Sequence, residues 1–318
     1  DGPFRAGLMR RYLLVIILAI AIFAALPYVL PTYYLSLATK ILIFALFAMS
    51  LDLLIGYTGL ASLGHAAFFG LGGYTVGVLV VRAHVSEWIA FPAGVAMAAA
   101  VGALFAVLAL RARGSYFLMI TLALAQVVWG IAFGWRTLTG GDDGLPGVRR
   151  PTFFVSLADE NSFYYFVLLM VGLSALALVA IVRSPFGHAL RGIRESETRM
   201  LALGYNVWRH QFVAFVIAAA FAGLAGSLFV YNNRFVSPDF LHVVRSAEVL
   251  IMVILGGVGT LLGPAIGAAV IILLEDFISS LTQRWLLILG IVYVVTTLFA
   301  PRGLIGLYKE HFSRNRKR

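Results

Sequence analysis

Apolar runs of about 20 residues recur from one end of this 318-residue chain to the other, and they restrict its fold more than any other feature. A run of this length, wound as a helix, crosses a hydrocarbon core of roughly 30 Å. With 61% hydrophobic and only 12% charged residues, the chain cannot hide its apolar surface inside one water-soluble globule. The sequence therefore predicts an all-α polytopic membrane protein, built as a single transmembrane domain over residues 1–318.

About ten transmembrane helices are expected, and several of them contain glycine-rich stretches. Runs such as FFGLGGYTVG and AGLAGSLF favour close helix packing, and the third, eighth and ninth spans are candidates for breaks or half-helices. GYTGLASLG at 56–64 resembles GGVGTLLG at 256–263, but two patterns this short can match by chance, so no repeat is inferred. The predicted spans lie near residues 12–30, 37–55, 61–81, 88–110, 115–135, 163–182, 211–231, 247–258, 261–280 and 285–300.

The net charge of +10 reflects lysines and arginines that lie between the apolar runs and at the two ends of the chain. Topology and contact with anionic lipid explain basic residues at these positions, so nucleic-acid binding is not expected. If the amino terminus is cytoplasmic, 16 of the 24 lysines and arginines fall on the inner side. This bias follows the positive-inside rule and predicts that both termini, including a basic tail over residues 301–318, are cytoplasmic. The chain has no cysteine, which excludes disulfides and thiol chemistry.

One charged stretch, LRGIRESETRMLALGYNVWRH at residues 190–210, lies between the sixth and seventh predicted spans. Ser184 followed by Pro185 predicts a helix start just before it, and Gly204 predicts the helix end. At 100° per residue the segment 185–204 has an apolar stripe and a charged face, so we expect an amphipathic helix on the inner face. The stripe contains Ala189, Ile193, Ser196, Met200 and Leu203, and the opposite face contains Arg191, Arg194, Glu195 and Thr198.

Three interpretations of this helix compete. It could rest on anionic lipid, tied internally by Arg191 to Glu195 and Glu195 to Arg199 at i, i+4 spacing. It could dock on a cytoplasmic partner with its apolar stripe in a groove, or it could be the gate of a self-sufficient transporter. Two glutamates argue against a pure lipid anchor, which favours unrelieved basic charge. Charge and periodicity alone leave anchoring and docking open.

The positions of Glu195, Ala202 and Gly204 on an inner loop resemble the coupling motif of ABC importer permeases, which begins Glu-Ala-Ala and has a glycine downstream. Together with further stretches, they make nearly the whole chain similar to the LivM-type permeases of branched-chain amino acid ABC importers. The sequence departs at His188, where arginine is usual, at Met200, where alanine is common, and in TGGDDG, where a serine often precedes a single aspartate. The stretches are LLIGYTGLASLGHAAFFGLGGYT (53–75), RGSYFLMITLALAQ (113–126), TGGDDGL (139–145), SPFGHALRGIRESETRMLALGYNVWRHQFVAFVIAAAFAGLAG (184–226), SAEVLIMVILGGVGTLLGPAIGA (246–268) and FAPRGLIGL (299–307).

The resemblance implies the transmembrane permease subunit of an ATP-binding cassette importer for branched-chain or related amino acids, in a bacterial plasma (inner) membrane. It implies a second homologous permease subunit as heterodimer partner, two ATP-binding subunits and an extracytoplasmic solute-binding protein. The phosphate-binding pattern G-x-x-x-x-G-K-[ST] does not occur in the sequence, so ATP hydrolysis is assigned to separate subunits. The chain is not expected to be an enzyme or to hold a cofactor, and no His or Cys cluster has metal-ligand spacing.

The same resemblance implies that the helix at 185–204 couples this chain to the ATP-binding subunits. Its apolar stripe would sit in their groove, and its charges would fix the register at the rim. The residues assigned to coupling are Arg191, Arg194, Glu195, Glu197, Arg199, Ala202 and Gly204.

Polar side chains at membrane depth are candidates for a translocation path because they are costly there. A structural role competes with this one at each position. Asp52 could cap a helix or lie at the interface, His65 could be a satisfied buried histidine, and Gln126 could bond between helices. The possible path residues are Asp52, His65, Thr121 and Gln126.

Two other functions are kept as alternatives. One is a stand-alone secondary transporter or channel for a small polar solute, and the other is an ABC permease for urea, amides or sugars. No chain of carboxylates runs through the predicted spans, which argues against the stand-alone transporter. Glu275 and Asp276, near the outer end of the ninth span, are expected to be solvated or to have helix-end roles. Apolar span residues do not distinguish amino acids from the other solutes.

Overall fold

The computed structural model describes residues 23, 25–152, 156–282, 284, 287–288, 290–291 and 294. The tail at 301–318 lies outside these residues, as do most of the tenth predicted span and most of the first. Six of the described helices are long and apolar enough to cross a membrane, and a shorter apolar helix covers His65–Val81. This confirms an all-α polytopic membrane protein, although the count of ten spans stays a prediction.

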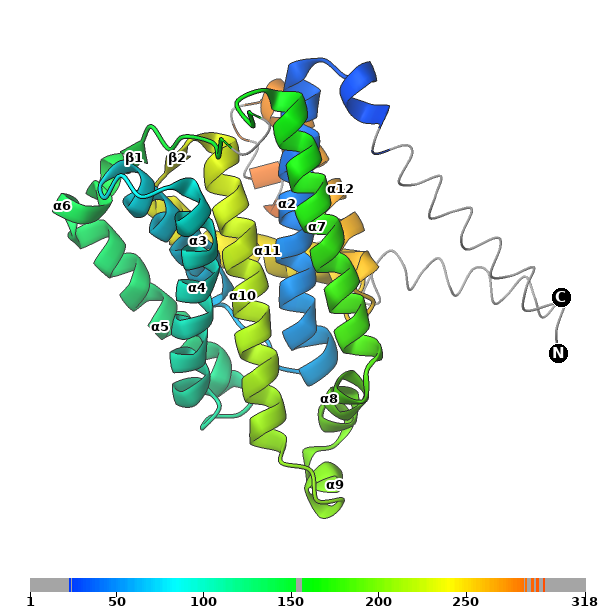
Figure 1. Ribbon diagram of the computed structural model, residues 1–318. Helices are drawn as coiled ribbons and strands as arrows, with labels where there is room; N and C mark the ends of the chain where they lie inside the picture. Colours follow the sequence, from blue (N-terminus) through cyan, green and yellow to red (C-terminus); the bar gives the residue numbers. More distant parts are fainter. Residues whose placement is uncertain are drawn as a thin grey trace, which may run out of the picture.

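Two helices form the centre of the bundle. α2 (Thr32–Asp52) continues through one π-helical segment to Thr58, and α10 (Val207–Asn233) packs beside it. In Figure 1, α3 (His65–Val81) and α4 (Glu87–Ala109) lie on one side of α10. Within the most apolar window of each span, 83% of the α2 residues and 67% of the α10 residues are buried, so these two helices have little contact with lipid.

Glycine allows α3 and α10 to approach closely, as the sequence predicts. A Cβ at Gly226 would lie 1.7 Å from the Phe69 carbonyl oxygen, and one at Gly72 would lie 2.1 Å from the Gly223 carbonyl oxygen. No side chain fits at these distances, because backbone atoms cannot move aside as a flexible side chain can. The glycine-rich runs on the two helices are therefore packing surfaces.

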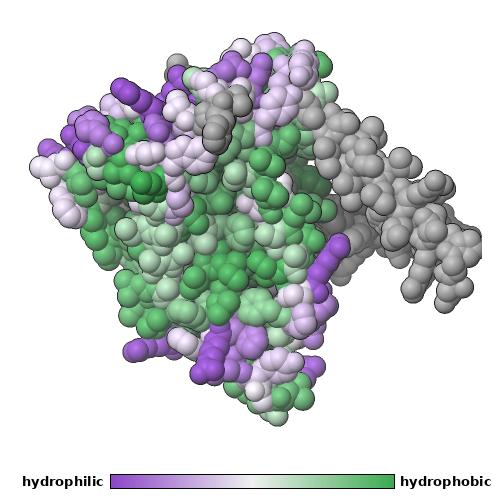
Figure 2. Space-filling model, viewed as in Figure 1, coloured by the Kyte–Doolittle hydropathy of each residue, from purple (hydrophilic) through white to green (hydrophobic). Residues whose placement is uncertain are grey.

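The outer helices expose more apolar surface. α5 (Ser115–Gly134) has only 22% of its apolar window buried, and α7 (Glu160–Arg183) has 28%. α12 (Leu262–Leu281) packs against α2 and has 39% buried. Figure 2 shows a hydrophobic zone across the middle of the visible face, with hydrophilic residues gathered at the two ends. The long helices of Figure 1 cross this zone from one hydrophilic end to the other, which is the arrangement expected of a membrane-spanning bundle.

Short elements close the end of the bundle opposite α8. The TGGDDG segment forms a turn, with the Gly144 N–H donating to the Gly141 carbonyl at 3.2 Å. A two-residue strand pair joins this loop to the segment after α10, with Leu145 opposite Val236. The short elements are α6 (Arg136–Thr139), the 3-10 turn η2 (Gly141–Asp143), β1 (Leu145–Pro146), β2 (Phe235–Val236) and the 3-10 turn η3 (Pro238–Leu241).

The helix after η3 begins inside the bundle. α11 (Val243–Gly256) starts four residues before the start of the predicted eighth span, 247–258, and ends two residues before the end of that span. The preceding Leu241 packs against Gly70, where a Cβ would lie 2.4 Å from the leucine side chain. Because Gly70 is five residues into the membrane helix α3, α11 starts at membrane depth and not at the surface. This is the broken-helix arrangement expected for a glycine-rich transporter segment.

Candidate functional site

The charged stretch forms two short helices at one end of the bundle, α8 (Pro185–Glu195) and α9 (Glu197–Ala202) (Figure 1). The predicted start is confirmed, since the Ser184 hydroxyl accepts from the Gly187 N–H at 3.4 Å. The prediction of one continuous helix over 185–204 is wrong. The chain is extended at Ser196 (φ −162°, ψ 103°), and the Ser196 hydroxyl accepts from the Arg199 N–H at 3.3 Å. A serine side chain that caps a new helix competes with continuing the old one.

Gly204 ends the second helix as predicted. Its φ is +84°, in the left-handed region that favours glycine. The Tyr205 N–H donates to the Met200 carbonyl at 3.1 Å, and the Gly204 N–H donates to the Leu201 carbonyl at 3.0 Å. These two bonds form a Schellman motif, which satisfies carbonyls at the helix end and turns the chain into α10.

The apolar stripe of α8 and α9 faces the chain itself. Ala189, Ile193 and Met200 are buried in one cluster with Val207 at the start of α10. The expectation that this stripe fills a partner's groove is therefore wrong, because its side chains already pack on their own bundle. Leu203, the last member, is 67% exposed. The large apolar side chains exposed at this end are Leu201, Leu203, Tyr205 and Trp208.

Two of the predicted coupling arginines contact the π-helical segment Leu53–Thr58 that continues α2. Arg194 donates from Nη1 to the Gly56 carbonyl, and the Arg191 guanidinium lies 5.0 Å from the centre of the Tyr57 ring. Among the described residues, Glu195 forms no ion pair with Arg191 or Arg199, so the predicted i, i+4 ties are absent. The positive charges of α8 are thus used to hold the helix against the bundle.

Asp52 joins the two glycine-containing segments that resemble each other in sequence, the π-helical segment at Gly56 and the loop between α11 and α12. Its buried carboxylate accepts from the Gly259 N–H at 2.6 Å and from the Leu261 N–H at 3.0 Å. A Cβ at Gly56 would lie 2.5 Å from the Gly259 nitrogen, so the two segments are in backbone contact. Together with the bond from Arg194 to Gly56, these contacts form a junction that links α8 to both segments.

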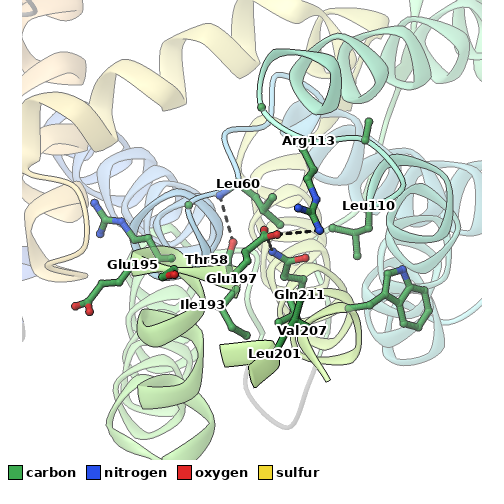
Figure 3. Close-up of a pocket in the computed structure, with 16 residues that line it drawn as sticks. Thr58, Leu60, Leu110, Arg113, Ile193, Glu195, Glu197, Leu201, Val207 and Gln211 are labelled. Atoms are coloured by element: carbon green, nitrogen blue, oxygen red, sulfur yellow. Dashed lines mark hydrogen bonds and ion pairs between the residues drawn. The ribbon is translucent and has the colours of Figure 1, made fainter. Parts of the chain in front are cut away.

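A cavity of about 370 Å³ opens between α8–α9 and the turn that joins α4 to α5. Arg113 on that turn lies 3.2 Å from the Glu197 carboxylate, and Gln211 donates to Glu197 at 3.1 Å. Figure 3 shows these three side chains converging, while Glu195 points away from them. Glu197 therefore connects α9 to two other elements, and Glu195 remains exposed for an external partner.

The possible path residues are not brought together as one group. His65 is fully buried, shares a hydrogen bond with the Ser50 hydroxyl at 2.8 Å and stacks on Phe47. Thr121 is buried and donates to the Leu118 carbonyl at 2.9 Å. Gln126 is half-buried on α5, and Asp52 belongs to the junction described above. The hydrogen bonds of Asp52 and Thr121 are made within the bundle, whereas His65 uses only Nε2, and its buried Nδ1 has no hydrogen-bond partner among the described residues.

Sequence reasoning missed a second group of charges, which we name the membrane charge cluster: Lys40, Arg245, Glu248 and Glu275. The Lys40 ammonium lies 3.2 Å from the Glu275 carboxylate, and Arg245 donates to Glu248 at 2.8 Å. The two cations flank the Phe44 ring, each 5.9 Å from its centre. The available signal was the presence of charged residues inside predicted spans: Lys40 in 37–55, Glu248 in 247–258, and Glu275 next to Asp276 in 261–280.

A model of the protein family described as the permease component of branched-chain amino acid transport systems matches residues 33–299. The chain belongs to this family. This confirms the resemblance drawn from the sequence motifs, and it makes the chain a permease component and not an enzyme.

Individual relatives agree with the family match. The chain is 30% identical to the high-affinity branched-chain amino acid transport system permease protein LivM of Escherichia coli K12, over 94% of this chain and 75% of that protein. It is 22% identical to a probable LivM of Methanocaldococcus jannaschii, over 81% and 89%. It is 24% identical to the permease protein LivH of Salmonella typhimurium, over 83% and 91%. No solved structure matches the chain.

Proposed function

We propose that this chain is the transmembrane permease subunit of an ATP-binding cassette importer that moves branched-chain or related amino acids into the cell. The family match and the names of the relatives support the substrate class. The observation that carries the coupling role is the contact of Arg194 with the Gly56 carbonyl, because it ties an exposed charged helix to the interior of the bundle.

The partners follow from what the chain lacks and what it exposes. The sequence has no phosphate-binding loop, so two ATP-binding subunits supply the energy. Relatives named LivM and LivH both match along most of this chain, which supports a second, homologous permease as the other half of the pore. A solute-binding protein delivers the amino acid on the outer side. The α8–α9 end is cytoplasmic in this arrangement, as are both termini.

The coupling residues divide into two sets. Arg191 and Arg194 hold α8 to the segment at Gly56, and Glu197 ties α9 to the α4–α5 turn. The set that meets the ATP-binding subunits lies on the outward side of α8, α9 and the start of α10, and an exposed apolar group with charges beside it suits a docking surface. This set contains Glu195, Arg199, Leu201, Leu203, Tyr205 and Trp208.

Motion of α8 reaches the membrane interior through the junction at Asp52. A displacement of α8 pulls on the Gly56 carbonyl through Arg194. The Asp52 carboxylate then passes the displacement to residues 259–261, which connect α11 to α12. Ala202 and Gly204 shape the end of α9, so that it turns directly into α10.

The deciding experiment reconstitutes the chain with its partner permease and ATP-binding subunits in lipid nanodiscs. ATP hydrolysis is measured with and without amino-acid-loaded binding protein, and stimulation is expected only with the full set. Amino acid or solute transport by the chain alone would support the stand-alone transporter instead.

Variants separate docking from transmission in the same assay. Leu203→Asp and Glu195→Lys are expected to weaken co-purification of the ATP-binding subunits. Arg194→Gln is expected to keep co-purification but to lower stimulated hydrolysis about tenfold, because the link to Gly56 is cut. Arg111→Gln, an exposed arginine near the cavity that does not line it, is the matched control. Normal stimulation in Arg194→Gln would count against the transmission role.

A further inference from the structure

Lys40 and Glu275 of the membrane charge cluster lie within helices long and apolar enough to cross a membrane, away from the helix ends. Lys40 is eight residues from the outer end of α2 at Thr32, which places it roughly 12 Å along the helix axis. Glu275 is six residues from the end of α12 at Leu281, roughly 9 Å along that axis. Arg245 is on the first turn of α11, which starts at membrane depth. Charges at this depth are expensive and mark functional sites more often than surface charges do.

These charges are not sealed inside the bundle. The exposed fractions of the side chains are 26% for Lys40, 27% for Arg245, 18% for Glu275 and 10% for Glu248. An ammonium or guanidinium group at this depth cannot face lipid tails, because nothing there replaces its hydration. The accessible side of the cluster therefore faces water or a polar group from outside the described chain.

The hydrogen-bonding capacity of the cluster is only partly used. Within the described part of the chain, Lys40 donates one hydrogen bond of the three its ammonium can make. Arg245 donates one of five, and one oxygen of each carboxylate accepts. The Lys40–Glu275 pair joins α2 to α12, whereas Arg245 and Glu248 pair within α11, and pairs with a purely structural role would be expected to satisfy more of these groups internally. The unused donors and acceptors have both signs, and the two ion pairs lie close together, since Lys40 and Arg245 are each 5.9 Å from the centre of the Phe44 ring.

We propose that the membrane charge cluster binds the zwitterionic head of the transported amino acid during its passage through the membrane. Lys40 and Arg245 bind the α-carboxylate, and Glu248 and Glu275 bind the α-ammonium. The cluster carries two positive and two negative charges, so an entering zwitterion exchanges partners without adding net charge to the site. The water that the two charged groups of the amino acid lose on leaving the outer solution is replaced by opposite charges.

This inference rests on the proposed function and narrows its substrate class. Urea, amides and sugars are neutral and need hydrogen-bonding groups, but they do not need paired charges of both signs. A solute that carries an ammonium and a carboxylate on one carbon does need them. The cluster thus favours amino acids over the other solutes considered for this family of permeases.

The test uses the difference between a structural ion pair and a binding site. Replacing both members of a buried pair by apolar residues of similar size leaves stability unchanged or raises it. The double variant Lys40→Met with Glu275→Leu is therefore expected to fold, to assemble with its partners and to keep hydrolysis stimulated by loaded binding protein. Its uptake of radiolabelled leucine into proteoliposomes is expected to fall at least tenfold.

The matched control removes a neighbouring contact between the same two helices. Tyr33 donates to the Asp276 carboxylate from the outer end of α2 to α12. The double variant Tyr33→Phe with Asp276→Asn is expected to take up leucine within twofold of the unmodified complex. If the first double variant fails to fold, Glu275→Gln, which keeps the size of the side chain and an acceptor oxygen for Lys40, is expected to lower uptake about tenfold with a smaller loss of thermal stability than Glu275→Leu.

The possible outcomes separate this inference from the proposed function. Stimulated hydrolysis without uptake in the Lys40 and Glu275 variant supports zwitterion binding. Normal uptake in that variant, or in Glu275→Gln, would show that the cluster only joins helices and would overturn the inference. Loss of the partner permease from the purified complex would also overturn it, since the cluster would then be an interface between subunits. A complete unmodified complex that shows neither stimulation nor uptake would overturn the proposed function itself.

Discussion

Two ion pairs in this protein have the same length and very different surroundings. Arg113 and Glu197 at the α8–α9 end lie 3.2 Å apart, and so do Lys40 and Glu275 between α2 and α12. The first pair is 79% and 29% exposed, and the second is 26% and 18% exposed at membrane depth. Distance alone therefore does not say what an ion pair contributes. The solvent around it decides how much is lost when one partner is removed.

The physical reason is the cost of a charge without a partner. In water a lone guanidinium or carboxylate is hydrated, so a surface pair contributes about 0–1 kcal/mol. In an apolar region the remaining charge keeps its desolvation cost, and removing one partner costs about 3–5 kcal/mol. Removing both partners also removes that desolvation cost. Single and double variants are therefore expected to differ in stability at membrane depth but not at the exposed pair.

The largest expected effect follows removal of one partner at membrane depth. Glu275→Leu alone is expected to destabilise the protein by about 3 kcal/mol, because the Lys40 ammonium is left unpaired. The double variant with Lys40→Met is expected to recover most of that loss. Thermal unfolding of the detergent-solubilised complex measures the stability of the single and the double variant. Equal stability of the two would contradict the expected difference between the pair at membrane depth and the exposed pair.

Asp52 provides an intermediate case, a buried anion held by neutral N–H groups and not by a cation. Asp52→Ala leaves the Gly259 and Leu261 amides unsatisfied and is expected to cost about 2 kcal/mol. Asp52→Asn keeps one acceptor oxygen and is expected to cost about 1 kcal/mol. Unfolding midpoints of the two variants rank these costs. An asparagine variant as unstable as the alanine one would show that the charge, and not the hydrogen bonds, holds the two segments together.

The smallest effect is expected at the exposed pair. Arg113→Ala is expected to cost less than about 1 kcal/mol, and that cost is expected to vanish in about 1 M salt, where screening is nearly complete within 3 Å. Stability of Glu275→Leu is expected to change little over the same salt range. Unfolding midpoints at low and high salt compare them, and a salt-insensitive Arg113 variant would indicate a packing role for that side chain.

The regular spans could be predicted because each is a long apolar run with clear flanks. Residues 88–110 and 115–135 were expected, and the helices are Glu87–Ala109 and Ser115–Gly134. Ser196 was placed on an apolar stripe, but the chain breaks there, and Ile193 and Met200 both reach the Val207 cluster from separate helices. The Ser196 side chain caps the second helix there, a role that the stripe's periodicity does not reveal.

The two charged regions differ in the same way. The coupling stretch is visible in the sequence because its charges are consecutive along one segment. Lys40 and Glu275 are 235 residues apart, and each lies in a run that is otherwise mostly apolar. No spacing rule connects them, since only the packing of α12 against α2 brings them together. The contact of Arg194 was likewise hidden, because it depends on where the segment at Gly56 lies.

The start of α11 inside the bundle has a consequence for biosynthesis. Residues 235–242 contain only a two-residue strand and one 3-10 turn, so lipid would leave most of their backbone groups without partners. Strand β1 and the Gly70 surface that receive this segment belong to earlier parts of the chain. The translocon therefore cannot release residues 235–256 into lipid as an independent span. We expect this segment to enter only after α3 and α10 have assembled, as a late step in the maturation of the subunit.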